Sequence, residues 1–234
     1  MLGGGESAPT VTLDVTGALV TFFNESYIEL TVLDSDTGGV GDIVITGSSG
    51  VVTRAVNGWT YSAIESVTPA SGQRGTTITI AGIGLLANDQ TLSKVKLTSA
   101  EATIVASNDT QIIATISAVQ VEGDVVNDMT IVLSNGQTVS GTDLFTYKIA
   151  GSINAIAPIS GQVGTEVTIT GTNLLGHGEG TLTSVNLAGT DVSEIVSAND
   201  TEVVVIASLS DAIVGDVTLV ADSGATVILQ DGDV

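Results

Sequence analysis

The chain has 234 residues, and its 5 Lys and Arg against 26 Asp and Glu give a formal net charge of −21. A chain this acidic repels a phosphate backbone, so we expect no nucleic-acid partner. One His and no Cys leave no Cys/His zinc site and no Cys nucleophile with a His base, and we expect a protein that is not an enzyme.

The composition is that of a globular protein that buries apolar cores. Hydrophobic residues make up 43% of the chain, whereas disordered acidic chains are poor in Val, Ile and Leu. Residues 1–6 contain neither a basic segment nor an apolar run, so we expect no secretory signal peptide in them. The apolar run 203–207 is far shorter than the roughly 20 residues of a membrane span, so we expect no direct membrane insertion.

Short segments with alternating apolar and polar residues predict β-strands along the whole chain. In chain order they include residues 11–15, 77–80, 95–97, 167–170 and 217–220. These segments are rich in β-branched residues, and Gly, Asn, Asp or Ser bounds each of them. Turn signals occur at hairpin spacing at 48–50, 134–136 and 222–224, and no segment has a sustained helical period. The sequence therefore predicts an all-β protein.

An internal repeat defines the domain organisation. The segment from Ile64 to Thr76 recurs from Ile153 to Thr165, a spacing of 89 residues, and the match continues through the following strand and a Leu-Leu pair. Residues 108–112 recur as 199–203, and 24–28 correspond to them near the amino terminus. We predict three units: residues 1–63 without opening strands, residues 64–149 complete, and residues 150–234 without a closing strand.

The incomplete terminal units have two explanations. An isolated sandwich without its first or last strand exposes an unpaired edge, so the chain is read as a window cut from a longer tandem array. In the alternative, the ends are native and neighbouring copies complete the open units by strand donation, which gives a head-to-tail polymer.

The motif that opens the complete units resembles the IPT/TIG family of immunoglobulin-like domains. It consists of Val67 to Thr76 and the strand 78–82; a later Asn-Asp-Thr segment and the closing strand 144–147 complete the family pattern. The resemblance covers essentially the whole chain and implies tandem immunoglobulin-like β-sandwiches. It leaves function open, because such sandwiches serve as spacers, adhesive arrays, receptor ectodomains and accessory domains.

Three Asn-x-Ser/Thr sequons fall at the same place in all three units, beginning at Asn24, Asn108 and Asn199. Each lies in a polar turn before a strand, where a glycan could extend into solvent in a secreted eukaryotic protein. The alternative is that Asn-Asp-Thr is simply favourable turn chemistry, since both side chains hydrogen-bond their own backbone.

Acidic loops provide weak calcium candidates, and no other cofactor is expected. Asp34, Asp36 and Asp42 are the best of them, but the Gly and the distal bidentate Glu of an EF-hand are missing. A solvated acidic surface is the simpler interpretation. His177 is interpreted as a turn residue, and the closing-strand aromatics are expected to cap the cores; they are Trp59, Tyr61, Phe145 and Tyr147.

The favoured function is a structural segment of a long extracellular or cell-surface tandem-repeat protein, such as a stalk or an appendage filament. Its expected partners are neighbouring repeats or copies of the same protein. The second hypothesis is an adhesin or receptor module that binds a carbohydrate or protein ligand. The third is an accessory region of a carbohydrate-active enzyme.

Overall fold

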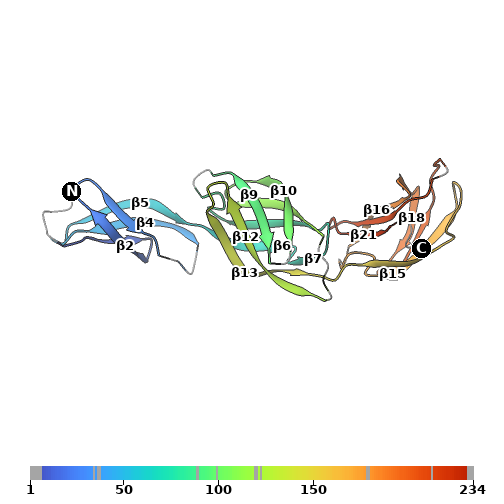
Figure 1. Ribbon diagram of the computed structural model, residues 1–234, viewed down its shortest axis with the longest axis horizontal. Coiled ribbons are helices and arrows are strands. Elements are labelled where there is room, and N and C mark those ends of the chain that lie inside the picture. The colour runs from blue at the N-terminus through green and yellow to red at the C-terminus, as the bar shows by residue number, and fades with distance from the viewer. Residues whose placement is uncertain are drawn as a thin grey trace.

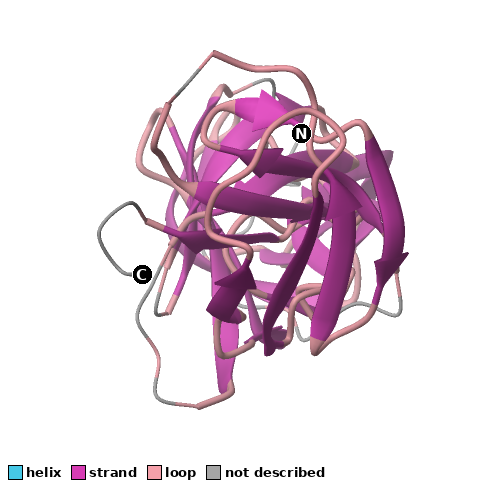
Figure 2. Cartoon of the chain, turned by 90° about the vertical axis from the view of Figure 1, so that its right-hand side faces the viewer, coloured by secondary structure: helices cyan, strands magenta, loops and turns pink. Residues whose placement is uncertain are grey.

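The computed structural model describes residues 7–33, 35, 38–87, 90–98, 100–118, 121, 123–177, 180–211 and 213–230. The described residues form strands, turns and loops and contain no helix (Figure 2). The strands gather into three groups that follow one another along the long axis of the molecule (Figure 1). We call these groups the first, second and third units.

The first unit is a single five-stranded antiparallel sheet with the order β3-β2-β1-β4-β5. Within its described part, Val11 and Leu13 are the buried large aliphatic side chains, whereas Phe22 and Tyr27 are half exposed. The apolar surface of this sheet therefore has no second layer over it in the described chain. Its strands are β1 (Thr10–Leu13), β2 (Thr16–Phe23), β3 (Ile28–Thr31), β4 (Gly39–Thr46) and β5 (Val52–Tyr61).

The second unit has eight strands in the order β6-β8-β11-β10-β9-β12-β13-β7, which fold around one core. Alternation drives this folding: in β8, Ile78 and Ile80 are buried while Thr77 and Thr79 face outward. The strands are β6 (Ala63–Thr68), β7 (Ser71–Gly72), β8 (Thr77–Ile83), β9 (Leu92–Leu97), β10 (Glu101–Ser107), β11 (Gln111–Ile116), β12 (Val125–Leu133) and β13 (Thr138–Tyr147).

The third unit is a sandwich of two four-stranded sheets, β14-β15-β19-β18 and β17-β16-β20-β21. Its core contains Ile169, Val185, Val203 and Leu219, all fully buried. Its strands are β14 (Ser152–Ala157), β15 (Glu166–Thr172), β16 (Leu182–Leu187), β17 (Thr190–Asp191), β18 (Glu194–Ala198), β19 (Glu202–Ile206), β20 (Val217–Ala221) and β21 (Thr226–Leu229).

The predicted fold class, tandem all-β sandwiches, is confirmed. The order β3-β2-β1-β4-β5 in the first unit repeats β11-β10-β9-β12-β13 of the second, and the described first unit has no counterparts of β6 and β8. In the third unit β21 ends at Leu229, whereas β13 of the second unit continues to Tyr147. The division at residues 63 and 149 stays a prediction.

Candidate functional site

The best-defined polar arrangement joins the second unit to the third, and it begins with a preformed loop. This loop, residues 72–77, connects β7 to β8, and we call it the Gln73 loop. Inside it, Thr76 Oγ1 accepts from the Gln73 amide at 3.1 Å, and the Thr76 amide donates to the Gln73 carbonyl at 3.2 Å. The Gly75 amide donates to the Ile116 carbonyl at 2.9 Å, with Gly75 at a φ of 87° that favours glycine. These hydrogen bonds hold the backbone of the Gln73 loop in place.

The facing element is the hairpin turn between β20 and β21, residues 221–226, which we call the β20–β21 turn. The Ala221 amide donates to the Ala225 carbonyl and the Gly224 amide to the Ala221 carbonyl, each at 2.9 Å. Gly224 has a φ of 82°, as a tight hairpin turn requires. Both partners in the junction are therefore locally closed structures.

Four hydrogen bonds join the two elements directly. The Thr77 amide donates to the Ser223 carbonyl at 2.9 Å, and the Thr226 amide donates to the Arg74 carbonyl at 3.0 Å. Gln73 Nε2 donates to the Thr226 carbonyl at 3.0 Å, and Arg74 Nε donates to Thr226 Oγ1 at 3.2 Å. Because Gln73 is fully buried, its bonds are shielded from competing water.

The linker between the second and third units, residues 148–151, is hydrogen-bonded to both of them. Gln73 Oε1 accepts from the Gly151 amide at 2.8 Å, so one side chain binds both the linker and the β20–β21 turn. His177, on a loop of the third unit, places Nε2 2.5 Å from the Ile149 carbonyl and donates to it when that nitrogen carries the proton. His177 lies in a turn, as its sequence context indicates, and it also contacts the linker.

An ion pair anchors the start of this linker. Lys148 Nζ lies 2.6 Å from Asp124 Oδ2, and the Ile149 amide donates to Asp124 Oδ1 at 3.4 Å. The hydrogen bond from Lys148 is the largest cause that holds the pKa of Asp124 below its ordinary value of 3.8. The carboxylate stays ionised, and available to the linker, across the neutral range.

Two glycines allow the backbones to approach closely. A Cβ added at Gly75 would lie 2.5 Å from the Gly224 carbonyl oxygen, and one added at Gly224 would lie 2.7 Å from the Gly75 carbonyl oxygen. Real Cβ atoms do not approach backbone so closely, so both positions need glycine for steric as well as conformational reasons. The junction therefore fixes how the second and third units meet.

The sequons at Asn108 and Asn199 have the same geometry. Asn108 Oδ1 accepts from the Thr110 amide at 2.9 Å, from Thr110 Oγ1 at 3.0 Å and from the Gln111 amide at 2.8 Å. Asn199 Oδ1 accepts the three equivalent bonds, from Thr201 and Glu202, at 2.8–2.9 Å. Both Asn residues are exposed, so the turn chemistry is present and glycosylation stays a prediction.

The first-unit sequon is held more loosely. Asn24 Oδ1 accepts from the Ser26 amide at 2.9 Å, and Asn24 is also exposed. In the two other units the Asp of Asn-Asp-Thr has its own structural partner: Asp109 Oδ1 accepts from the Leu86 amide at 3.0 Å, and Asp200 Oδ1 from the Leu175 amide at 3.1 Å. The repeated Asn-Asp-Thr and Leu-Leu motifs therefore bind each other.

Of the calcium candidates, Asp34 and Asp36 lie outside the described residues. The Asp42 carboxylate is engaged within the protein, because Oδ1 accepts from the Asn57 amide at 2.8 Å and Oδ2 pairs with Arg54. The Asn57 hydrogen bond is the largest cause that lowers the pKa of Asp42. No group of three His, Cys, Asp or Glu side chains that could hold a metal occurs within the described ranges. Calcium binding stays a prediction.

The carboxylate of Asp42 stabilises a bulge between β4 and β5, where Asn57 has a φ of 51°. The second unit repeats this arrangement, because Asp128 Oδ1 accepts from the Asp143 amide at 3.0 Å and Asp143 has a φ of 55°. These two carboxylates therefore accept hydrogen bonds from the backbone at the bulges, so part of the negative charge of the chain has a structural role.

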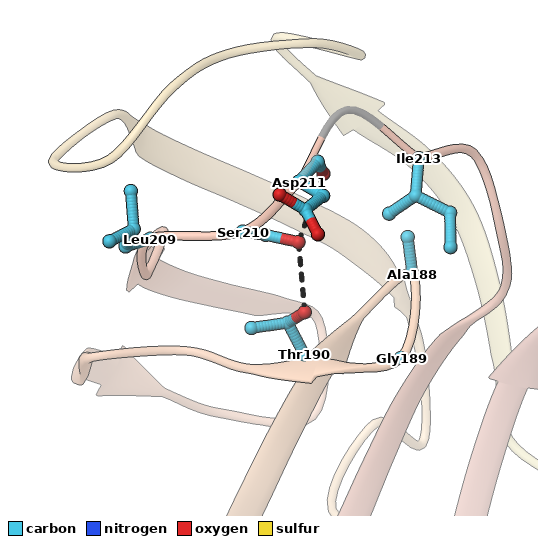
Figure 3. Close-up of a pocket in the computed structure, with 7 residues that line it drawn as sticks. All are labelled: Ala188, Gly189, Thr190, Leu209, Ser210, Asp211 and Ile213. Carbon is cyan, nitrogen blue, oxygen red and sulfur yellow. Dashed lines mark hydrogen bonds between the residues drawn. The ribbon is translucent and has the colours of Figure 1, made fainter.

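A pocket of about 610 Å³ opens on the third unit, between the β16–β17 hairpin and the segment that follows β19 (Figure 3). Inside it Thr190 Oγ1 donates to Ser210 Oγ at 3.0 Å, and Ser210 Oγ donates to the Asp211 carbonyl at 3.1 Å, so both hydroxyl protons already have acceptors. Its lining has no aromatic ring for a sugar to stack on and no titratable pair for catalysis. The lining residues are Ala188, Gly189, Thr190, Leu209, Ser210, Asp211 and Ile213.

The closing-strand aromatics differ between units. Phe145 and Tyr147 are buried in the core of the second unit, and the Tyr147 hydroxyl donates to the Ser117 carbonyl at 3.3 Å. Trp59 and Tyr61 are partly exposed in the first unit and pack edge to face, with ring centroids 5.9 Å apart. The first unit thus places its aromatic pair on an open sheet.

Sequence reasoning did not find the roles of Gln73 and Thr226. A signal was present for Gln73, because the same residue recurs as Gln162 between the two glycines of the repeated motif. The signal did not reveal the partners, since they lie 78 and 153 residues away in the chain.

The described residues contain no helix that could span a membrane.

Comparisons with known proteins identify the family of the units. The family model of the IPT/TIG domain matches residues 62–147 and 152–231. No curated protein sequence matches the chain.

Several solved structures are similar at low identity. The extracellular region of plexin A4, domains 1 to 10, is similar over 93% of this chain and 21% of that chain, at 15% identity and a TM-score of 0.48. SGBP-B from a mixed-linkage glucan utilization locus of Bacteroides ovatus, in complex with a heptasaccharide, is similar over 94% of this chain and 56% of that chain, at 18% identity and a TM-score of 0.30. The chain thus spans less than two thirds of either protein. The I9–I11 tandem from titin is similar over 96% of this chain and 87% of that chain, at 12% identity and a TM-score of 0.29.

Proposed function

The chain belongs to the IPT/TIG domain family, and from this membership we propose that it is a structural segment of a longer extracellular tandem-repeat protein. Its role is to hold successive sandwiches at a fixed spacing and angle, and it is not catalytic. The end-to-end arrangement of the three units supports this role (Figure 1).

The observation that carries the proposal is the junction between the Gln73 loop and the β20–β21 turn. Neighbouring domains in one chain move relative to each other by default, unless their interface restrains them. Here four direct hydrogen bonds, a buried Gln73 and a glycine-to-glycine backbone contact restrain the pair. A module that only tethers a ligand-binding domain needs no such restraint, whereas a spacer of defined length does.

The exposed sequons support the extracellular location that we propose. Asn24, Asn108 and Asn199 all lie on turns where a glycan would meet only solvent. Release of glycan from these asparagines by a glycosidase, followed by peptide mapping of native material, checks this part of the proposal. Unmodified Asn at all three positions would remove this support.

Distance measurement by double electron–electron resonance tests the proposed spacer role. The chain has no Cys, so spin labels can be placed at Val105→Cys and Val196→Cys, whose native side chains are 63% and 50% exposed on the second and third units. We expect one narrow distance distribution. Gly75→Ala should broaden it, because its Cβ would meet the Gly224 carbonyl oxygen at 2.5 Å.

Gly164→Ala is the matched control. Gly164 is the counterpart of Gly75 in the repeated motif of the third unit. It also has a positive φ, 83°, but a Cβ added there would meet nothing within 4 Å. Both substitutions carry the strain of a positive φ, and only one disturbs the junction. A distribution that is already broad in the parent chain, or equally narrow in Gly75→Ala, would contradict the spacer role.

A further inference from the structure

The third unit carries a second copy of the Gln73 loop, and this copy faces solvent. It comprises residues 161–166, and we call it the Gln162 loop. The Gln162 amide donates to Thr165 Oγ1 at 2.9 Å and the Thr165 amide to the Gln162 carbonyl at 3.0 Å, as in the Gln73 loop. The Gly164 amide donates to the Ala207 carbonyl at 2.9 Å. The loop is therefore preformed, and residues 161–164 are exposed, whereas Gly72 and Gln73 are buried.

Apolar side chains gather at the same end of the third unit. Val163 lies in the Gln162 loop and Ile159 just before it, and the segment after Ala207, whose carbonyl accepts from the Gly164 amide, adds further apolar residues. The corresponding residues in the second unit are the smaller Ala70 and the charged Arg74. Such an exposed apolar end is typical of a surface that docks another protein. The exposed fractions are 78% for Ile159, 57% for Val163, 80% for Leu209, 62% for Ile213 and 79% for Val214.

The complementary turn lies at the opposite end of the molecule. Residues 47–52 join β4 to β5, with the Gly47 amide donating to the Val51 carbonyl at 2.8 Å and the Gly50 amide to the Gly47 carbonyl at 2.9 Å. These two bonds, and a φ of 81° at Gly50, reproduce the β20–β21 turn. Thr46 pairs with Val52, and Gly39 with Tyr61 next to the second unit, so the turn points away from that unit.

The Gln162 loop and the 47–52 turn differ from the junction within the chain in one pair of side chains, and both members of the pair differ. In the junction within the chain, Arg74 donates to Thr226. In the Gln162 loop and the 47–52 turn the corresponding residues are Val163 and Val52, which are 57% and 59% exposed. A polar pair is thus replaced by an apolar pair, so these two side chains need no hydrogen-bond partner on contact.

We propose that the Gln162 loop binds the 47–52 turn of a second copy of this 234-residue segment, so that copies join head to tail through the contact that successive units of a longer array would also use. The contact repeats the junction between the second and third units, with Val163 packed on the partner copy's Val52. The side-chain Nε2 of Gln162 takes the place of Gln73 Nε2 and donates to the carbonyl of that valine. The inference deepens the proposed spacer function and rests on it.

The contact forms between separate molecules, so it is weaker than the junction within the chain. Inside the chain the linker supplies a high effective concentration, which two free copies do not have. Each copy also carries a net charge of −21, and this repulsion is screened when the Debye length falls to about 4 Å near 0.5 M salt. We therefore expect association at high protein concentration that strengthens as salt is raised.

Sedimentation velocity of the full 234-residue chain, in about 0.1 M and about 0.5 M salt, measures this association. Val163→Arg removes the apolar partner of Val52 and should lower the association constant about tenfold or more. Combining Val163→Arg with Val52→Thr transplants the Arg74–Thr226 pair and should restore association to within about threefold of the parent. Val196→Arg is the matched control, because Val196 is 50% exposed on β18 of the same unit, and it should change nothing.

Loss in Val163→Arg with recovery in the double variant supports the docking. Association that is equally strong in Val163→Arg, or equally weakened in Val196→Arg, would overturn it. A chain that stays monomeric at every concentration and salt would also overturn it and would leave the loop to another partner. The spacer function fails separately, since it is measured between two labels within one monomer.

Discussion

The junction is most directly tested by shortening Gln73 to alanine. The side chain is fully buried and makes two hydrogen bonds, one to the Thr226 carbonyl at 3.0 Å and one from the Gly151 amide at 2.8 Å. Gln73→Ala leaves that carbonyl and that amide without their partner. Each buried group that loses its partner costs about 1–2 kcal/mol, so the closed junction should lose about 2–4 kcal/mol.

Amide hydrogen exchange followed by NMR measures this loss where it occurs. Since about 1.4 kcal/mol corresponds to a factor of ten, protection at Gly151 and Thr226 should fall by about 30-fold to 700-fold. Amides in the cores of the two units, such as Ile80 and Val203, should keep their protection, because both side chains are fully buried away from the junction.

Gln162→Ala provides the matched control. Gln162 occupies the same position in its own loop, its amide makes the same bond to a threonine hydroxyl, and its side chain is exposed. In dilute solution this variant should leave protection at Gly151 and Thr226 within about twofold of the parent. Unchanged protection in Gln73→Ala would show that the side chain does not hold the junction closed, and the reasoning would fail.

Three further predictions concern the second unit. Asn108→Ala should destabilise the second unit by about 1–2 kcal/mol in urea unfolding because it removes an acceptor of three bonds, and an effect no larger than that of Asn24→Ala would contradict this. The pKa of Asp124 lies below 3.8, so its contribution to stability is complete above that value and is lost as the pH falls through the lower, folded-state pKa. Lys148→Ala should accordingly raise the pKa of Asp124 in a carboxyl NMR titration, and an unchanged pKa would exclude the ion pair as its cause. Phe145→Ala should cost about 3–5 kcal/mol because the ring is 1% exposed in a packed core, and a loss below 1 kcal/mol would contradict that packing.

The fold could be predicted from sequence because its signals are local or repeated. The alternation in Thr77–Ile83 predicts a half-buried strand, and that strand buries Ile78 and Ile80. Asn108-Asp109-Thr110 has the composition of a turn, and it forms one by bonding its own backbone. Short-range chemistry of this kind is visible without knowledge of tertiary contacts.

The junction could not be predicted in the same way. Whether Gln73 is a solvated loop residue or a buried connector depends on a turn 153 residues further along the chain. Its repeat counterpart Gln162 has the same local geometry and is exposed, so local sequence does not distinguish the two. Asp42 presents a similar case: as a sequence letter it is a calcium candidate, but its partners Arg54 and Asn57 are determined by strand register.

The glycine contact at the junction also has a consequence for how such a chain can change its length. The third unit carries both halves of the contact, a loop glycine at Gly164 and a turn glycine at Gly224, and the second unit likewise carries Gly75 and Gly136. A duplication or deletion of one whole unit by recombination between repeats therefore brings a matched pair of glycines to each new boundary. Exchange out of register within a unit would separate loop from turn. The number of whole units can therefore vary while every boundary keeps its pair of glycines.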